Sequence, residues 1–188
     1  MELYNNRGFV IAAGRIESIK LQDTSHYVVT ATDSSSRKHV SRFTGRHAET
    51  LKRLLYRPRD GEPFIVSGYL KDGVINVYQF ILCGGSFSDQ RMLTPDGQTL
   101  TVIAGKICRN PQVAAMRNEE GKMIPLDIFS LFYPKQGISH FWKVCFQDRL
   151  SAMYHSSIHP GSFAVVLGIE KEQKESDRFM LGMSMAII

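Results

Sequence analysis

The sequence repeats itself, and this constrains the fold more than any other feature. Residues 8–16 (GFVIAAGRI) resemble residues 100–107 (LTVIAGKI): both are apolar runs that end in glycine, a basic residue and isoleucine. Residues 64–70 (FIVSGYL) then resemble residues 163–169 (FAVVLGI), and a glycine-containing turn precedes each of them. Because the chain has 188 residues, the repeat predicts two small domains of roughly 90 to 100 residues each.

The two halves share one order of predicted elements: three strands, a short helix and two further strands. Rough alternation of apolar and polar residues, with many Val, Ile, Phe and Tyr, indicates the strands. In the first half we expect strands at 9–22, 27–33, 39–44, 63–71 and 74–82, with the helix at 48–56. In the second half we expect strands at 100–108, 123–133, 140–146, 162–170 and 178–187, with the helix at 149–154.

Five strands with a helix between the third and the fourth is the order of the OB-fold, a small Greek-key barrel. The sequence therefore predicts an all-β protein with two tandem OB-folds. We expect the first at 1–83, a linker at 84–98 and the second at 99–188. The linker prediction rests on a shift to Gly, Ser, Asp and Pro, which is typical of a domain boundary.

The second half resembles the bacterial single-stranded DNA-binding protein family over about 90 residues, the span of one OB-fold. The matching motifs, in order, are VIAGKICRNP at 102–111, Gly-Lys at 121–122, IFSL at 128–131, FWKVCF at 141–146, Pro-Gly at 160–161 and VVLGI at 165–169. The first half matches through AAGRI at 12–16, FTGRHAE at 43–49 and GEPFIVSGYL at 61–70.

This resemblance implies an OB-fold protein that coats single-stranded DNA without sequence preference, in replication, recombination, repair or the transfer of mobile elements. Some members of the family carry two OB-folds in one chain and pair as dimers, so we expect a homodimer. Members usually end in a disordered tail with an acidic tip that recruits other proteins. Residues 182–188 are apolar instead, so we expect a last strand there and no recruiting tail.

Binding of single strands requires flat rings that stack on unpaired bases and a basic groove that follows the phosphates. In the second half the candidate stacking residues are Trp142, Phe146, Phe132 and Tyr133, and the candidate phosphate ligands are Lys106 and Arg109. In the first half the candidate stacking residues are Tyr27, Phe43, Tyr69 and Tyr78. The sequence leaves open the alternative that some of these rings fill the barrels instead, since large aromatic residues dominate protein cores as well.

Alternation along a strand separates the aromatic residues at 141–146 into two faces. Trp142, Val144 and Phe146 share one face, which we assign to DNA, and Phe141 and Cys145 share the other, which we assign to the core. Lys143 does not fit a core-facing position and suggests a bulge or a strand end. With Trp142 stacked on bases, its fluorescence is expected to be quenched by single-stranded DNA.

Positive charge is concentrated in one segment of the chain. Residues 37–59 hold eight basic residues and one acidic residue, a local charge of +7, while the whole chain has a net charge of +5. A local positive field of this kind attracts polyanions. The candidate phosphate ligands here are Arg37, Lys38, Arg42, Arg46, Lys52 and Arg53.

No motif for catalysis, nucleotide binding or metal binding is present in the sequence. We therefore expect a non-enzymatic protein without a metal, cofactor or small-molecule substrate. No apolar run reaches the length of a membrane span, and the N-terminus lacks signal-peptide features, so we expect a cytoplasmic protein. Two alternatives to DNA binding stay open, because OB-folds serve many functions: an RNA-binding protein, and a protein-interaction subunit of a larger complex.

Overall fold

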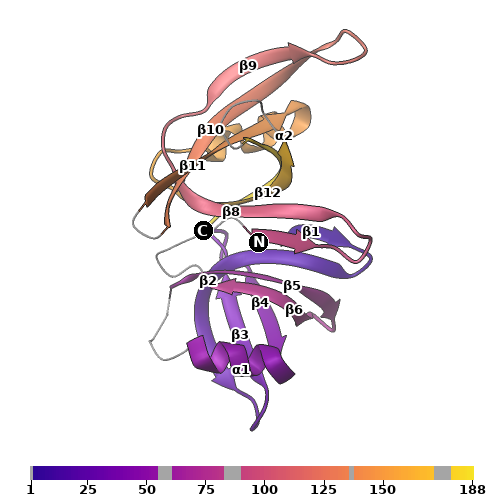
Figure 1. Cartoon of the computed structure of the whole chain (residues 1–188), viewed down its shortest axis with the longest axis vertical. Coiled ribbons are helices and arrows are strands. Elements are labelled where there is room, and N and C mark those ends of the chain that lie inside the picture. The colour runs from indigo at the N-terminus through magenta and orange to yellow at the C-terminus, as the bar shows by residue number, and fades with distance from the viewer. Residues whose placement is uncertain (1, 55–60, 83–89, 136–137, 172–178) are drawn as a thin grey trace. The chain divides into compact units, whose positions relative to one another are not determined.

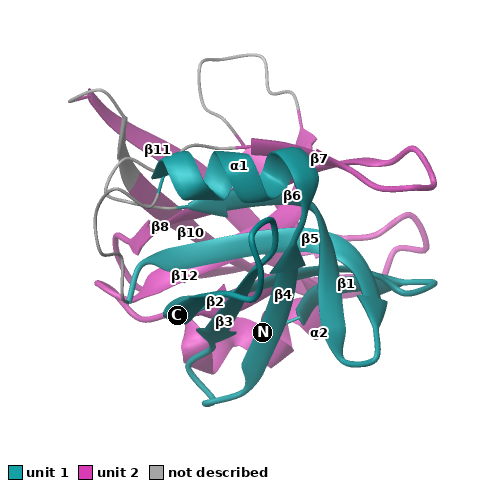
Figure 2. Ribbon diagram, turned by 90° about the horizontal axis from the view of Figure 1, so that it is seen from below, with its two compact units in different colours: residues 1–84, 188 teal, residues 85–187 magenta. Residues whose placement is uncertain are grey.

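The computed structural model describes residues 2–54, 61–82, 90–135, 138–171 and 179–188, except the side chains of residues 133–135. The chain divides into two compact units, residues 1–84 with residue 188 and residues 85–187 (Figure 2). Among the described residues, no helix has the length and apolar composition that a bilayer-spanning segment requires.

The described residues of unit 1 form a five-stranded barrel with one helix. Its elements are β2 (Phe9–Leu21), β3 (Tyr27–Thr32), β4 (Lys38–Phe43), α1 (Gly45–Leu54), β5 (Pro63–Lys71) and β6 (Val74–Leu82). The strands lie in the order β2-β3-β4-β6-β5, and pairing of β5 with β2 closes the barrel. Strands β4 and β6 run parallel, while the other barrel pairs are antiparallel. This is the OB-fold, with its helix between the third and fourth barrel strands, as the sequence predicts.

Unit 2 repeats this topology. Its elements are β8 (Thr99–Ile107), β10 (Met123–Lys135), β11 (Ile138–Gln147), α2 (Asp148–Tyr154), the 3₁₀ helix η1 (His155–Ser157), β12 (Phe163–Lys171) and β13 (Phe179–Ile187). The strands lie in the order β8-β12-β13-β11-β10, and pairing of β10 with β8 closes the second barrel. Strands β11 and β13 are again the parallel pair. The internal repeat in the sequence is therefore a repeat of the whole fold.

Three of the described strands lie outside the predicted pattern. In unit 1, β1 (Glu2–Asn6) pairs with the start of β2. In unit 2, β7 (Gln90–Leu93) pairs with β8, and β9 (Gln112–Arg117) forms a hairpin with β10 that extends beyond the barrel (Figure 1). Residues 90–93 fall within the predicted linker, because the polar residues around them give no strand pattern. The strand is held by pairing with β8 and by burial of Met92.

The core of unit 1 is formed by side chains from all five barrel strands and from α1. Phe43, Phe64 and Ile75 are buried there, and Ala48 and Leu51 of α1 pack on the same cluster. Apolar side chains recur on one side of α1 because they are three residues apart, which is the spacing of an amphipathic helix. Helix α1 therefore covers the end of the barrel and leaves its basic residues in solvent.

A buried carboxylate attaches the helical segment of unit 2 to its barrel. The side chain of Asp127 on β10 accepts a hydrogen bond from Ser151 Oγ of α2 at 3.0 Å, and its other oxygen lies 3.0 Å from His155 Nδ1 of η1. Asp127 is 1% exposed, so these two contacts supply the polar partners that a buried carboxylate needs. In the described ranges, His, Cys, Asp and Glu side chains form no group of three or more suited to a metal ion.

Glycine occupies one equivalent position in the two barrels. The register of β5 with β6 shifts between Ser67 and Gly68, and the register of β12 with β13 shifts between Leu167 and Gly168. A Cβ atom on Gly68 would lie far inside van der Waals contact with the carbonyl oxygen of Asn76, and one on Gly168 would meet the carbonyl oxygen of Leu181 in the same way. Both bulges thus require a residue without a side chain.

We expect Gly68→Ala to destabilise unit 1 by about 1–3 kcal/mol, because the added methyl group must push two paired strands apart. The measurement is the midpoint of urea unfolding followed by circular dichroism. Leu70→Ala, at an exposed position two residues further along β5, is the matched control and should change the midpoint little. An unchanged midpoint in the Gly68 variant would show that the bulge adapts to a side chain.

Candidate nucleic-acid interface

In OB-folds, oligonucleotides bind on the face formed by the second and third barrel strands and at the adjoining loops. These strands are β3 and β4 in unit 1 and β10 and β11 in unit 2. On a strand, neighbouring side chains point to opposite sides of the sheet. Which aromatic residues face outward therefore decides where bases can stack.

On β11 the structure reverses the predicted placement of the aromatic side chains, while Cys145 is buried as predicted. Trp142, Val144 and Phe146 are each 0% exposed and fill the barrel, whereas Phe141 is 58% exposed. Phe146 packs against Phe129 at 5.8 Å between ring centroids and against Tyr154 at 4.8 Å. The assignment of Trp142 and Phe146 to base stacking is wrong, because a fully enclosed ring offers no face to a base.

Lys143 is the signal in the sequence that identifies the outward face of β11. It is exposed, and it lies two residues from Phe141, so the two side chains share one face. The ladder between β10 and β11 runs from residue 126 to residue 135 without a register shift. No bulge is therefore present at Lys143, and simple alternation places Phe141 in solvent.

An aromatic pair lies on the outer face of unit 2. Phe132 on β10 and Phe141 on β11 are directly opposite each other, with ring centroids 5.5 Å apart and an interplanar angle of 46°. Lys106 on β8 is the register partner of Phe132 on the other side and is exposed. Lys106, Phe132 and Phe141 therefore form one row across three strands. We call these three residues, together with Lys143, the unit 2 aromatic surface.

Two further residues of unit 2, Arg109 and Tyr133, are predicted from the sequence to bind nucleic acid. Arg109 is exposed two residues beyond the end of β8. The side chain of Tyr133 lies outside the described part of the structure. Phe141, which the sequence analysis assigns to the core, and Lys143 are the residues of this surface that are missing from the predicted site.

In unit 1 the structure buries one predicted stacking residue and exposes two. Phe43 is 0% exposed and packs against Phe64 and Phe80, so its assignment to base stacking is wrong for the same reason as in unit 2. Tyr27 is half-buried and packs against the barrel core. Tyr69 and Tyr78, by contrast, are 50% and 52% exposed.

Tyr69 and Tyr78 pack against the same buried ring, that of Phe9. Both contact Phe9 edge-on, with ring centroids 5.4 Å and 6.2 Å from it. Tyr78 occupies the bulge between β5 and β6, where no residue of β5 is its register partner. The register continues from Tyr69 through Asn76 to Arg42 on β4. We call Tyr69, Tyr78, Asn76 and Arg42 the unit 1 aromatic surface.

The predicted cations of unit 1 differ in their electrostatic surroundings. Arg37 is paired with Asp33 at 3.1 Å, and Lys38 with Glu17 at 2.8 Å. Arg42 is half-buried, and its Nε atom has no hydrogen-bond partner among the described residues. The remaining candidates are exposed on α1, which carries Arg46, Lys52 and Arg53.

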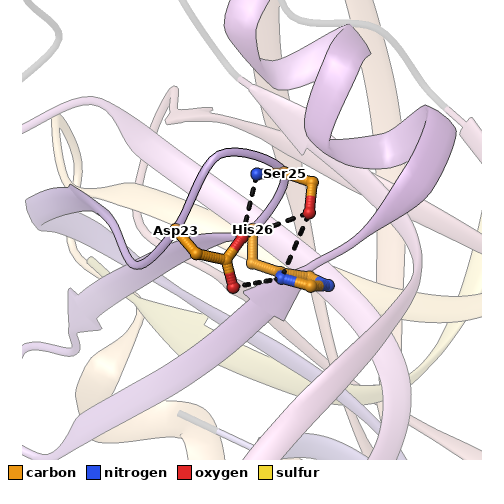
Figure 3. A network of polar contacts seen from close by, with 3 residues as sticks. All are labelled: Asp23, Ser25 and His26. Carbon is orange, nitrogen blue, oxygen red and sulfur yellow. Dashed lines mark hydrogen bonds and ion pairs between the residues drawn. The ribbon is translucent and has the colours of Figure 1, made fainter.

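The loop between β2 and β3 is fixed by a small polar network (Figure 3). Asp23 accepts a hydrogen bond from the backbone N–H of Ser25 at 2.8 Å, and its other oxygen lies 2.5 Å from His26 Nδ1. These contacts, chiefly the bond from Ser25, lower the pKa of Asp23 from 3.8 to about 2. The network orders a loop that adjoins the second strand of the barrel.

Because the pKa of Asp23 is lowered, the carboxylate stabilises this loop fully above about pH 4 and ceases to do so as the pH falls through 2. We expect the backbone amide resonance of Ser25 to shift in an NMR titration with a midpoint of about 2. The Asp23→Asn variant should show no such titration. A midpoint at 3.8, the ordinary carboxyl value, would mean that the network does not form in solution.

Family models and curated protein sequences give no match to this chain. Solved structures do. The second single-stranded DNA-binding protein (SSBb) of Mycobacterium smegmatis matches at 18% identity, with a TM-score of 0.39, over 47% of this chain and 86% of that chain.

Two further solved structures match over 96% of this chain. The single-stranded DNA-binding protein of Thermus aquaticus matches at 15% identity, with a TM-score of 0.39, over 92% of its own length. A replication protein A heterotrimer bound to single-stranded DNA matches at 10% identity, with a TM-score of 0.37, over 49% of its chain. Bacterial single-stranded DNA-binding proteins, which the sequence motifs resemble, are thus among the proteins to which this chain is similar.

Proposed function

We propose that this chain binds single-stranded DNA, without chemical change and largely without sequence preference, through the aromatic surfaces of its two OB-fold units. The outer-face pair Phe132 and Phe141, with Lys106 beside it in register, is the observation that carries this proposal. The pair lies on the second and third barrel strands, which form the oligonucleotide face of the fold.

The chemistry of the two surfaces fits an unpaired strand. Every base has a flat π-face, so exposed rings bind single strands of any sequence. The bases of a duplex are already stacked and cannot reach such rings. Lys106 and Arg109 in unit 2, and Arg42 with the cations of α1 in unit 1, supply positive charge to the two units. Phosphate contacts of this kind release counterions and make binding depend on salt.

The test is fluorescence polarisation of a labelled oligo-dT strand of about 35 nucleotides, a length that several OB-folds can share. We expect binding that weakens as salt rises and that an excess of duplex DNA does not displace. Competition with an oligo-U strand of equal length decides between DNA and RNA. Absence of binding at low salt would overturn the proposal.

The β9–β10 hairpin favours a second candidate, a protein-interaction subunit. Val113 and Met123 of this hairpin are 65% and 55% exposed, and they share one of its faces, four register positions apart. Exposed apolar side chains on one face can mark a protein interface. In that case the chain should fail to bind oligo-dT and should be captured with a partner protein. We further propose that the DNA-binding form is a homodimer, which light scattering after gel filtration tests directly.

A further inference from the structure

Glu17 on β2 connects the first three strands of the unit 1 barrel on their outer side. One carboxylate oxygen lies 2.8 Å from Lys38 Nζ on β4, and the other accepts a hydrogen bond from Thr32 Oγ1 on β3 at 2.8 Å. These two hydrogen bonds, the one from Lys38 first, lower the pKa of Glu17. The group is therefore a carboxylate at neutral pH, and both of its oxygens are engaged.

Asp33 forms an ion pair with Arg37, the residue before Lys38. Its carboxylate is 1% exposed and lies 3.1 Å from Arg37 Nε. It also accepts hydrogen bonds from the backbone N–H groups of Ser35 and Arg37, at 2.9 Å and 3.0 Å. Arg37 and Lys38 at the start of β4 are thus each paired with a carboxylate.

The electrostatic surroundings at the opposite end of β4 are different. Arg42 lies four residues further along the strand, about 13 Å away at the rise of a β-strand. Among the described residues it forms no ion pair, and it is in register with Asn76 and, beyond it, with Tyr69. Positive charge and exposed rings therefore coincide at this end of the strand.

We infer that Glu17 determines where a nucleic-acid strand lies on unit 1: it occupies Lys38 and so withholds this cation from phosphates at the start of β4, which directs the strand to Arg42 and the unit 1 aromatic surface. This inference rests on the proposed function. It assigns to Lys38, a predicted phosphate ligand, a contact that competes with phosphate binding.

The test is the Glu17→Gln variant, measured with oligo-dT over a range of salt concentrations. Glutamine keeps the size of the side chain and can still accept the hydrogen bond from Thr32, but it no longer holds Lys38 by charge. We expect tighter binding and a plot of log K against log salt that is steeper by about 0.7, the contribution of one further phosphate contact to a single strand. Glu49→Gln on α1, an exposed glutamate, removes the same charge and should give a smaller gain and no change in slope.

Lys38→Met completes a double-mutant cycle. In the wild-type background we expect this variant to change affinity little, whereas Glu17→Gln with Lys38→Met should lose the gain of the single variant. The acetylation rate of Lys38, followed by mass spectrometry without DNA, should rise in Glu17→Gln because the amine is released.

Each outcome separates the inference from the proposed function. Wild-type binding together with an unchanged Glu17→Gln affinity, or an equal gain in the two glutamine variants, would overturn this inference alone. A gain in Glu17→Gln that survives removal of Lys38 would also overturn it. No binding by the wild-type chain at low salt would overturn the proposed function, and the inference with it.

Discussion

Phe141→Ala is expected to weaken oligo-dT binding by about 5- to 150-fold, which corresponds to the roughly 1–3 kcal/mol that one stacked base contributes. Phe141 is 58% exposed and forms half of the aromatic pair on unit 2. In the variant, Phe132 is the one remaining ring of this pair on which a DNA base can stack. Because no phosphate contact is lost, the salt dependence of binding should keep its slope.

Met153→Ala is the matched control for this experiment, because Met153 is 51% exposed and lies on α2 rather than on a barrel strand. It should bind oligo-dT like the wild type. The double variant Tyr69→Ala with Tyr78→Ala measures unit 1 in the same way, and its effect relative to Phe141→Ala shows how the two units share the strand. Wild-type affinity in all of these variants would exclude both aromatic surfaces as the binding site.

Trp142→Ala, one residue away, is expected to affect the fold instead. Trp142 is fully buried in the barrel of unit 2, and truncation of a buried tryptophan costs about 3–5 kcal/mol. We expect a large decrease in the stability of unit 2, measured by urea unfolding followed by circular dichroism. Trp142→Phe, which keeps a ring in the cavity, should lose clearly less than the alanine variant.

The buried position of Trp142 also changes the expected fluorescence. It is the only tryptophan in the chain, so its emission reports on unit 2 and should lie at short wavelength in the folded protein. Since no base can stack on it, oligo-dT should leave the emission nearly unchanged under conditions in which polarisation shows binding. Strong quenching by oligo-dT would mean that the barrel opens to expose the ring.

Much of the fold is determined by local features of the sequence. The repeated apolar runs, the turns that precede them and the intervening helices predict two five-stranded OB-folds, and the structure contains both. The glycines at 68 and 168 occupy the same position of the repeat, and the structure shows that each lies at a bulge with no room for a side chain. Strands β7 and β9 are not predictable in this way, since both are held by pairing with a neighbouring strand that local sequence does not reveal.

The candidate site depends on tertiary structure. Alternation along 141–146 separates Phe141 from Trp142 but does not say which of them faces the barrel, because both are large and aromatic. That choice is made by the partners across the strands: Trp142 lies opposite the buried Leu131, while Phe141 lies opposite Phe132 on the outer face. Likewise, the sequence shows a basic segment, but only the folded chain brings Glu17 onto Lys38 and leaves Arg42 in register with Asn76 and the exposed Tyr69. The sequence therefore determines that aromatic rings and positive charge are present, and the packing of the barrels decides which of them can meet a ligand.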